Sequence, residues 1–344
     1  MLLKKTTTII ATSLLLSLIS FSTCSAHQKE EIRIVVTLDI LQTIVSPILE
    51  DMGEVYPIIS GDVEPHSFTL TPSIIQEALN SDLIVITGHI DWEKELVEKV
   101  SEERGVHPSL ISLNLLNLSG IRILEVEGER NVHGFWLLPD NVIAIAKALE
   151  DKLSTLKPEY SEKFSENYVL FEREILKLKD TLIKLSEKYG YLGRRVVVGF
   201  YAEQYIAEAM GLKVDTVLIG EEETIRPETL IRIYGGFKSG DYTCIVVSDT
   251  ALLMSGVQNA LKEMSEETGC SIAYVSTISS NGLDRYDYVM CYNAGQVYSA
   301  LLSSRRSVSS GLNVYLLTTI LALLVIVVET VILVRGWVRI RAAR

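Results

Sequence analysis

Histidine and cysteine are scarce in this chain. Its 344 residues include five histidines and four cysteines, at Cys24, Cys244, Cys270 and Cys291. The cysteine spacing matches no zinc-finger motif. The sequence also has no His-Glu-x-x-His segment and no nucleophile elbow, so the signatures of a zinc protease and of an α/β-hydrolase are missing. Any function of the few histidines must therefore come from loops that bring them together.

The chain also lacks an excess of positive charge. It has 32 lysines and arginines against 44 aspartates and glutamates, which gives a net charge of −12. Because this negative charge repels the phosphate backbone, we do not expect a nucleic-acid partner. With 48% apolar and 22% charged residues, the composition is typical of a globular protein and favours neither disorder nor a coiled coil. No internal repeat of about 20 to 50 residues is found.

The N-terminus is typical of an export signal. Lys4 and Lys5 precede an apolar run, and small and polar residues end at Ala26, so we expect residues 1–26 to be a signal peptide. Lipid attachment at Cys24 is an alternative, although the residues before it match a lipoprotein signal poorly. After cleavage three cysteines remain. Cys244 and Cys270 could pair if their strands are neighbours, and buried free thiols are the other interpretation.

A nearly continuous apolar run occupies residues 314–334, long enough as a helix to cross the hydrocarbon core of a bilayer. Four arginines follow it in a basic tail, residues 335–344, which predicts a cytoplasmic C-terminus by the positive-inside rule. The sequence therefore predicts a single-pass membrane protein with its binding domain outside the cytoplasm. A serine-rich stalk, residues 304–313, would lead to the anchor.

From residue 32 onward, short β-branched runs alternate with helical stretches, the pattern of an α/β fold with parallel sheets. We expect a first lobe over residues 27–139, a linking spine helix over residues 140–190 that Pro158 kinks or restarts, and a second lobe over residues 191–303. Strands are expected at residues 32–37, 55–59, 82–86, 195–198, 216–219, 243–248 and 271–275.

Three histidines of the first lobe are candidate metal ligands. His66 lies in the segment VEPHSFTLTPS, residues 63–73, before a helix that Thr71 and Pro72 begin. His89 follows the strand at residues 82–86, and ligands of open α/β sheets bind beyond the carboxyl ends of strands. His133 lies in the segment NVHGFWLLP, residues 131–139. Ordinary alternatives are a helix-capping role for His66, a satisfied loop histidine at 133 and a solvated side chain at 89.

Together these features resemble the metal-binding solute-binding proteins of ABC importers, the zinc and manganese receptors of cluster A-I. The resemblance covers about residues 32–303. That family has a Pro-His-x-Tyr/Phe-x-x-x-Pro-Ser segment with its first metal ligand, which Pro65, His66, Phe68, Pro72 and Ser73 match. Its second ligand lies in an Asn-Pro-His-x-Trp-Leu-Asp-Pro segment. Asn131, His133, Trp136, Leu137 and Pro139 follow this segment with one extra residue before the tryptophan and Leu138 in place of aspartate.

The second lobe departs from the family pattern. The resemblance aligns the third ligand, a histidine or glutamate, with Phe200, and the fourth, an aspartate or glutamate, with about Ser276. Neither side chain is a usual metal ligand. Four outcomes are open: Glu203 or a water fills the gap, His89 completes the site from the first lobe, or metal binding has been lost.

The resemblance implies a non-enzymatic receptor that captures a divalent metal and delivers it to an ABC transporter permease. Ligands dominated by imidazole favour Zn²⁺ over Mn²⁺, which prefers oxygen. One alternative is a diverged receptor that binds another solute or serves as an assembly module. A zinc hydrolase using His66, His89 and His133 is the least favoured, because no general base is evident.

Overall fold

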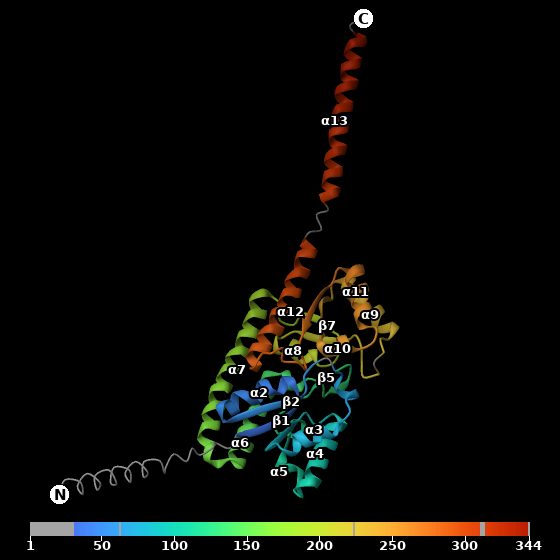
Figure 1. Ribbon diagram of the computed structural model, residues 1–344. Coiled ribbons are helices and arrows are strands. Elements are labelled where there is room, and N and C mark those ends of the chain that lie inside the picture. Colours follow the sequence, from blue (N-terminus) through green and yellow to red (C-terminus); the bar gives the residue numbers. More distant parts are fainter. Residues whose placement is uncertain (1–30, 62, 223, 310–313, 343–344) are drawn as a thin grey trace, which may run out of the picture. The chain divides into compact units, whose positions relative to one another are not determined.

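The computed structural model describes residues 31–61, 63–222, 224–309 and 314–342 (Figure 1). The predicted signal peptide, residues 1–26, and the alternative lipid site at Cys24 lie outside the described residues. Two four-stranded sheets organise the remainder, which confirms the α/β fold with parallel sheets flanked by helices.

The first sheet has the order β2-β1-β3-β4. Its pairings β1–β3 and β3–β4 are parallel. Every residue of β1 except Arg33 is buried, as is all of β3, because these short apolar runs form the centre of the lobe. The strands are β1 (Ile32–Leu38), β2 (Gly53–Ile59), β3 (Leu83–Ile86) and β4 (Ser112–Asn114), and the helices between them are α2 (Asp39–Leu49), α3 (Pro72–Leu79), α4 (Asp91–Arg104) and α5 (Pro108–Ile111).

The second sheet has the order β10-β9-β7-β8, with all three neighbouring pairs parallel. Its carboxyl strand ends, like those of the first sheet, lead into the loops that carry the polar residues considered below. The strands are β7 (Arg195–Val198), β8 (Lys213–Val217), β9 (Tyr242–Ser248) and β10 (Ser271–Val275), with helices α8 (Glu203–Ala209), α9 (Pro227–Ser239), α10 (Asp249–Leu253), α11 (Val257–Thr268) and α12 (Tyr286–Ser309).

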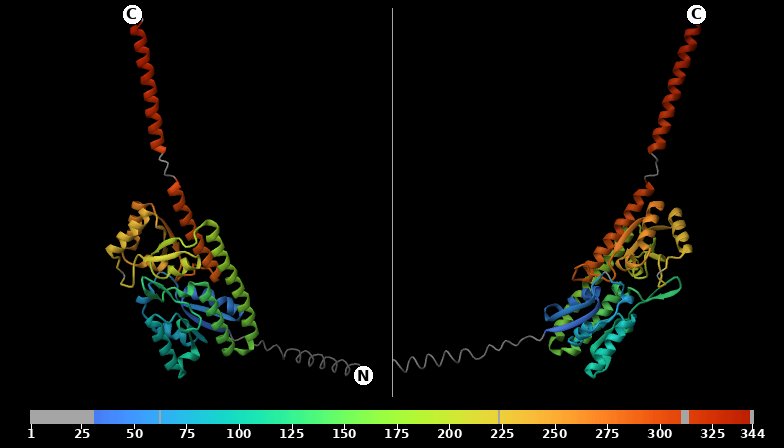
Figure 2. Two further views of the ribbon diagram at one scale, coloured as in Figure 1. Left: turned by 180° about the vertical axis from the view of Figure 1, so that it is seen from behind. Right: turned by 45° about the vertical axis from the view of Figure 1, so that its right-hand side comes forward.

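Of the two outcomes expected at Pro158 within the spine segment, residues 140–190, the restart is confirmed and the kink is not. The segment forms two helices, α6 (Pro139–Leu156) and α7 (Ser161–Tyr189), separated by a short 3-10 turn that begins at Pro158. Because proline cannot donate the helical hydrogen bond and disfavours helical geometry at the residue before it, the chain turns there. The two helices then pack against each other, and α7 contacts helices of both lobes, α2, α8 and α12. Figure 2 shows α7 running beside α12.

A small antiparallel hairpin, β5 (Leu124–Val126) and β6 (Glu129–Asn131), belongs to the first lobe by sequence. Its contacts nevertheless extend to the second lobe. The backbone N–H of Leu124 donates to the Tyr205 hydroxyl at 3.0 Å, and Arg232 of α9 pairs with Glu127 in the hairpin turn. The hairpin therefore fixes the loop that carries His133 between the lobes.

The predicted membrane anchor falls within α13 (Val314–Ala342). Among the residues that the structure describes, no helix is long and apolar enough to span a membrane. The anchor at residues 314–334 stays a prediction. Helix α12 continues to Ser309, so residues 304–309 are helical where a stalk was expected.

The cysteines of the second lobe are free thiols. Cys244 and Cys270 are buried and Cys291 is exposed, and none of the three forms a disulfide. Cys244 of β9 pairs in register with Ser271 of β10, so its neighbour across the ladder is a serine rather than Cys270. Of the two interpretations drawn from the sequence, free thiols are confirmed.

Candidate metal centre

His66 is presented by a single 3-10 turn, Pro65–Ser67, after β2. The Glu64 carboxylate caps this turn by accepting the backbone N–H of Ser67 at 2.6 Å. The Trp92 indole N–H donates to the Pro65 carbonyl at 2.8 Å and ties the turn to α4. These contacts hold the backbone while the His66 imidazole remains exposed, so this ring is the solvent-facing member of the site.

His89 follows β3, and its ring orientation is set by a hydrogen-bonded relay. The Thr87 hydroxyl donates to the buried Glu93 carboxylate at 2.6 Å and lies 2.8 Å from Nδ1 of His89. A hydroxyl has one hydrogen, which Glu93 takes, so the oxygen must accept from an Nδ1–H of the imidazole. The lone pair of His89 is therefore on Nε2, the nitrogen available to a metal.

His133 lies between β6 and the 3-10 turn Phe135–Leu137. Its backbone N–H donates to the Asn131 side chain at 2.9 Å, and its imidazole, only 7% exposed, stacks on Tyr201 with ring centroids 5.6 Å apart. Gly134 next to it has φ +81°, and a Cβ there would lie 2.7 Å from the Cα of Ala202. The second lobe thus packs directly against the His133 loop.

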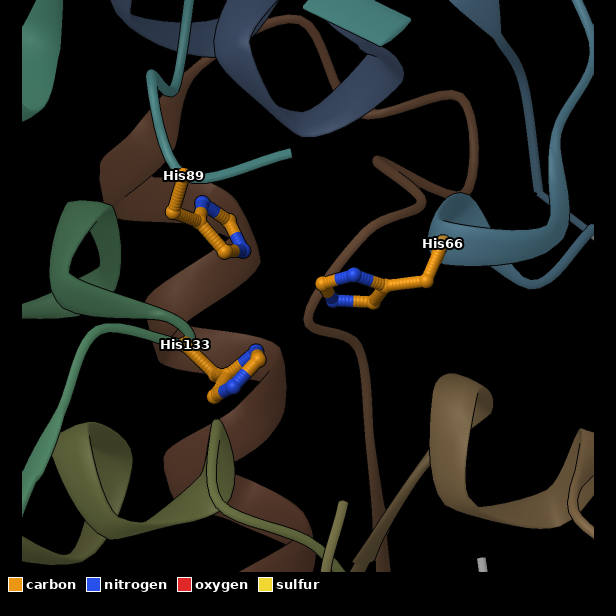
Figure 3. Close-up of side chains that lie close together, drawn as sticks. All are labelled: His66, His89 and His133. Carbon is orange, nitrogen blue, oxygen red and sulfur yellow. The ribbon is translucent and has the colours of Figure 1, made fainter. Parts of the chain in front are cut away.

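The structure brings all three predicted histidines together (Figure 3). One potential ligand nitrogen from each ring lies within 4.8 Å of the other two, and the ring centroids are 5.1 to 5.5 Å apart. Ligand nitrogens of a tetrahedral zinc ion at about 2.0–2.1 Å would be ~3.3 Å apart. Small side-chain movements would close the rings around one ion.

The three rings line a cavity of about 20 Å³ between the lobes. A water molecule needs roughly 10–15 Å³ on this measure, so the cavity is sized for one ion or water and not for an organic solute. The first lobe contributes the imidazoles, Glu64 and Trp136. Facing them from the second lobe are Phe200, Ala202, Thr250 and Ile278.

Burial keeps two of the rings neutral. It lowers the pKa of His89 to about 2, with further lowering by the neighbouring His133 and His66 rings. Burial also lowers the pKa of His133, an effect that the Glu221 carboxylate opposes by hydrogen bonding. Neutral imidazole is the form that donates a lone pair to a metal, so these rings are in their ligating state at physiological pH.

The family model for ZnuA, the periplasmic component A of the zinc-uptake complex, matches residues 34–300. The chain belongs to the ZnuA family. It is 23% identical over 291 residues to the manganese-binding lipoprotein MntA of Halalkalibacterium halodurans, covering 81% of this chain and 91% of the relative. It is also 23% identical over 314 residues to the manganese ABC transporter substrate-binding lipoprotein PsaA of Streptococcus mitis, covering 84% and 96%. A crystal structure of ZnuA shares the fold, with a TM-score of 0.66, 18% identity, and coverage of 79% of this chain and all of that one.

The second-lobe positions that the sequence aligned to ZnuA-family ligands do not supply metal donors. The Phe200 ring lies in the cavity wall, with its centroid 5.2 Å from that of His133. Ser276 is buried and does not line the cavity, and its backbone N–H donates to the Asn293 side chain. Glu203, the alternative ligand, is fully buried, and its carboxylate accepts the backbone N–H groups of Phe200 and Ser248. Glu203 therefore braces the second sheet and does not reach the three-histidine group.

Two residues that contact the three-histidine group were missed in the sequence. Thr87 orients His89, and a Thr-x-His spacing at a strand end could have indicated it. Oε1 of Glu221 lies 3.0 Å from Nε2 of His133, within hydrogen-bonding distance. No sequence signal identified Glu221, because the two residues are 88 positions apart and belong to different lobes.

Proposed function

We propose that this chain is a receptor that captures a divalent metal ion through His66, His89 and His133 and delivers it to a membrane permease of an ABC importer. The observation that supports this most is the convergence of three imidazoles at a cavity sized for one ion. In this proposal His89 takes the place of the two family ligands whose positions Phe200 and Ser276 occupy. The metal is cargo, and no chemical reaction is assigned to the site.

Zinc is the cargo that the donor set favours. Three neutral nitrogen donors suit Zn²⁺ in tetrahedral geometry, whereas Mn²⁺ prefers more oxygen ligands and higher coordination numbers. The relatives named for manganese have low identity, so they do not decide the metal. Manganese is therefore the second candidate rather than an equal one.

The cavity also weighs against the two alternatives. A hydrolase would have to admit an ester or peptide beside the metal, and about 20 Å³ leaves no room for one without large lobe movement. The same volume disfavours an organic solute for a diverged receptor. A module that binds nothing is still distinguishable by direct titration.

Calorimetric titration of the chelator-stripped protein with zinc and with manganese tests the proposal. We expect one zinc ion to bind with micromolar or tighter affinity, and binding to be lost in His66→Ala, His89→Ala and His133→Ala. His107→Ala is the matched control, because His107 is an exposed loop histidine that contacts Ser109 away from the cavity. Heat-silent titrations with both metals would support the non-binding module instead. Equal zinc binding in His66→Ala and His107→Ala would contradict the role of His66 as a ligand.

We further propose that residues 1–26 direct export and that residues 314–334 anchor the receptor, with the metal site outside the cytoplasm. Large apolar side chains of α13 such as Leu321 and Val327 are more than half exposed, so the helix does not bury them within the protein. Tethering would raise the effective concentration of receptor near a permease. Alkaline extraction of membranes should leave the full chain in the pellet and release a variant that ends at residue 304. Release of both would contradict the anchor.

A further inference from the structure

The second lobe approaches the three histidines through one carboxylate. All three imidazoles come from the first lobe, whereas the second-lobe residues that line the cavity, Phe200, Ala202, Thr250 and Ile278, are poor metal ligands. Glu221 lies in the loop between β8 and α9, and its Oε1 is 3.0 Å from Nε2 of His133. This contact is a polar link from the second lobe to a candidate ligand.

The contact determines which nitrogen of His133 faces the ion. A neutral imidazole carries one N–H, and an ionised carboxylate can only accept, so the hydrogen must be on Nε2. The lone pair is then on Nδ1. The stacked Tyr201 ring fixes the plane of the imidazole, and the hydrogen bond from the His133 backbone N–H to the Asn131 side chain fixes its position. The contact with Glu221 then determines the tautomer.

We propose that Glu221 is the positioning residue through which the second lobe acts on the captured metal, by holding His133 as the Nε2–H tautomer with Nδ1 on the ion. This inference rests on the proposed function of the three-histidine site. In His89 the nitrogens are used the other way round, because Thr87 holds Nδ1 and Nε2 is left for the ion. In both His89 and His133, therefore, the protein holds one ring nitrogen and the other is available to the metal. Outer hydrogen bonds of this kind orient metal-ligating histidines and raise their basicity.

The same bond couples the metal to the position of the lobes. An ion on Nδ1 draws electron density from the imidazole and strengthens the Nε2–H bond to the carboxylate, so the loaded site holds the lobes together more firmly. Reciprocally, a lobe movement that withdraws Glu221 weakens metal binding, because equilibrium coupling between two events acts in both directions. Glu221 would thereby let a permease that separates the lobes release the ion.

The neighbouring Glu222 provides an internal control. Its carboxylate pairs with Arg226 at 2.8 Å, and its side chain is 70% exposed, close to the 69% of Glu221. Removing either carboxylate changes the net charge of the loop equally. Because Glu221 is largely hydrated, water and salt screen its charge, and we expect an effect near the lower end of the range for outer-sphere partners.

Zinc titration of the full-length chain forms the first arm of the test. Glu221→Ala is expected to weaken zinc binding about tenfold. Glu221→Gln, which keeps an acceptor oxygen without the charge, is expected to lie between this variant and the wild type, and Glu222→Ala should bind like the wild type. Equal affinities in Glu221→Ala and Glu222→Ala would overturn the inference. Failure of the wild type to bind zinc would instead defeat the proposed function.

The second arm reads the tautomer directly in the metal-free protein. Two-bond ¹H–¹⁵N spectra of histidine-labelled protein, assigned with His133→Gln, should show Nε2–H for residue 133 in the wild type and Glu222→Ala. Glu221→Ala should show a mixture of tautomers. An Nδ1–H tautomer in the wild type, or a zinc-loaded crystal structure with the Glu221 oxygen bound to the ion at about 2.0–2.2 Å, would overturn the positioning role.

Discussion

The hydroxyl of Thr87 lies 2.8 Å from Nδ1 of His89 while it donates to the Glu93 carboxylate at 2.6 Å. Glu93 is fully buried and also accepts the backbone N–H groups of Thr87 and Gly88. These donors hold the Glu93 carboxylate in place at the end of β3. The carboxylate in turn orients the Thr87 hydroxyl, which orients the His89 imidazole. Glu203 plays a comparable bracing role at the end of β7.

Thr87→Val removes the hydroxyl and keeps the shape of the side chain. We expect zinc affinity to fall about tenfold, because Nδ1–H of His89 loses its acceptor and the ring its orientation. Stability should fall by about 1–3 kcal/mol, since the buried Glu93 loses a donor. Titration calorimetry and urea unfolding measure the two effects. Thr87→Ser should restore both, and an unchanged zinc affinity in Thr87→Val would refute the orienting role.

Acid should destabilise the metal-free protein through His89. Its pKa is lowered from an ordinary 6.5 to about 2 in the folded state by burial, so between these values the unfolded chain binds more protons. The contribution of His89 to the free energy of unfolding is therefore fully present above pH 6.5 and is lost progressively as the pH falls toward 2. At pH 5.5 the loss should be about 1 kcal/mol relative to pH 7.5.

The comparison that isolates this effect is wild type against His89→Gln. Glu203 acts in the opposite direction, because burial raises its pKa to about 7 and the folded state then holds its proton more tightly. Both proteins contain Glu203, so its contribution cancels in the difference between their unfolding free energies. Equal slopes of unfolding free energy against pH in the two proteins would show that His89 does not titrate as described.

Thiol accessibility should separate the three cysteines of the second lobe. Cys291 is exposed, and partial burial and the nearby Asp287 raise the pKa of its thiol. Cys244 and Cys270 are buried; burial raises the pKa of the Cys244 thiol to about 12 and also raises that of Cys270. Because the thiolate is the reactive form, a maleimide at neutral pH should modify Cys291 in the native protein and reach Cys244 only after unfolding. Peptide mapping by mass spectrometry measures this. Protection of both Cys244 and Cys270 from alkylation, even after denaturation, would indicate a disulfide between them and contradict the free thiols.

The sequence predicted the parts of this molecule that depend on local patterns. Buried strands such as β1 and β9 are short β-branched runs, and the helices α3 and α6 begin at Pro72 and Pro139, a residue that favours the first helical position. The placement of His66 and His89 in loops after strands was also predictable, because a parallel sheet gathers its carboxyl ends at one edge. His133 instead follows β6 of the antiparallel hairpin. The roles of all three as ligands remain a proposal.

Contacts between distant segments could not be predicted in the same way. The reversal at Pro158 depends on α6 and α7 packing face to face, and local periodicity cannot distinguish that from one kinked helix. Glu221 looks like any acidic loop residue until the second lobe is placed against His133. The hairpin β5–β6 was missed because each of its strands has only three residues, too few for a period-two pattern.

Gly134→Ala should loosen the closure of the lobes over the metal site. Gly134 has φ +81°, unfavourable for alanine, and the added Cβ would lie 2.7 Å from the Ala202 Cα and 2.9 Å from its carbonyl oxygen. Backbone atoms cannot move aside as a flexible side chain can, so strain and clash together should cost about 2 kcal/mol or more. Gly105→Ala is the control, because it has φ +65° with nothing within 4 Å of its Cβ and should lose only about 1 kcal/mol. Urea unfolding gives the two losses, and zinc titration should show weaker binding in Gly134→Ala alone. If the two variants unfolded and bound zinc alike, the backbone contact between Gly134 and Ala202 would not be what holds the second lobe against the His133 loop.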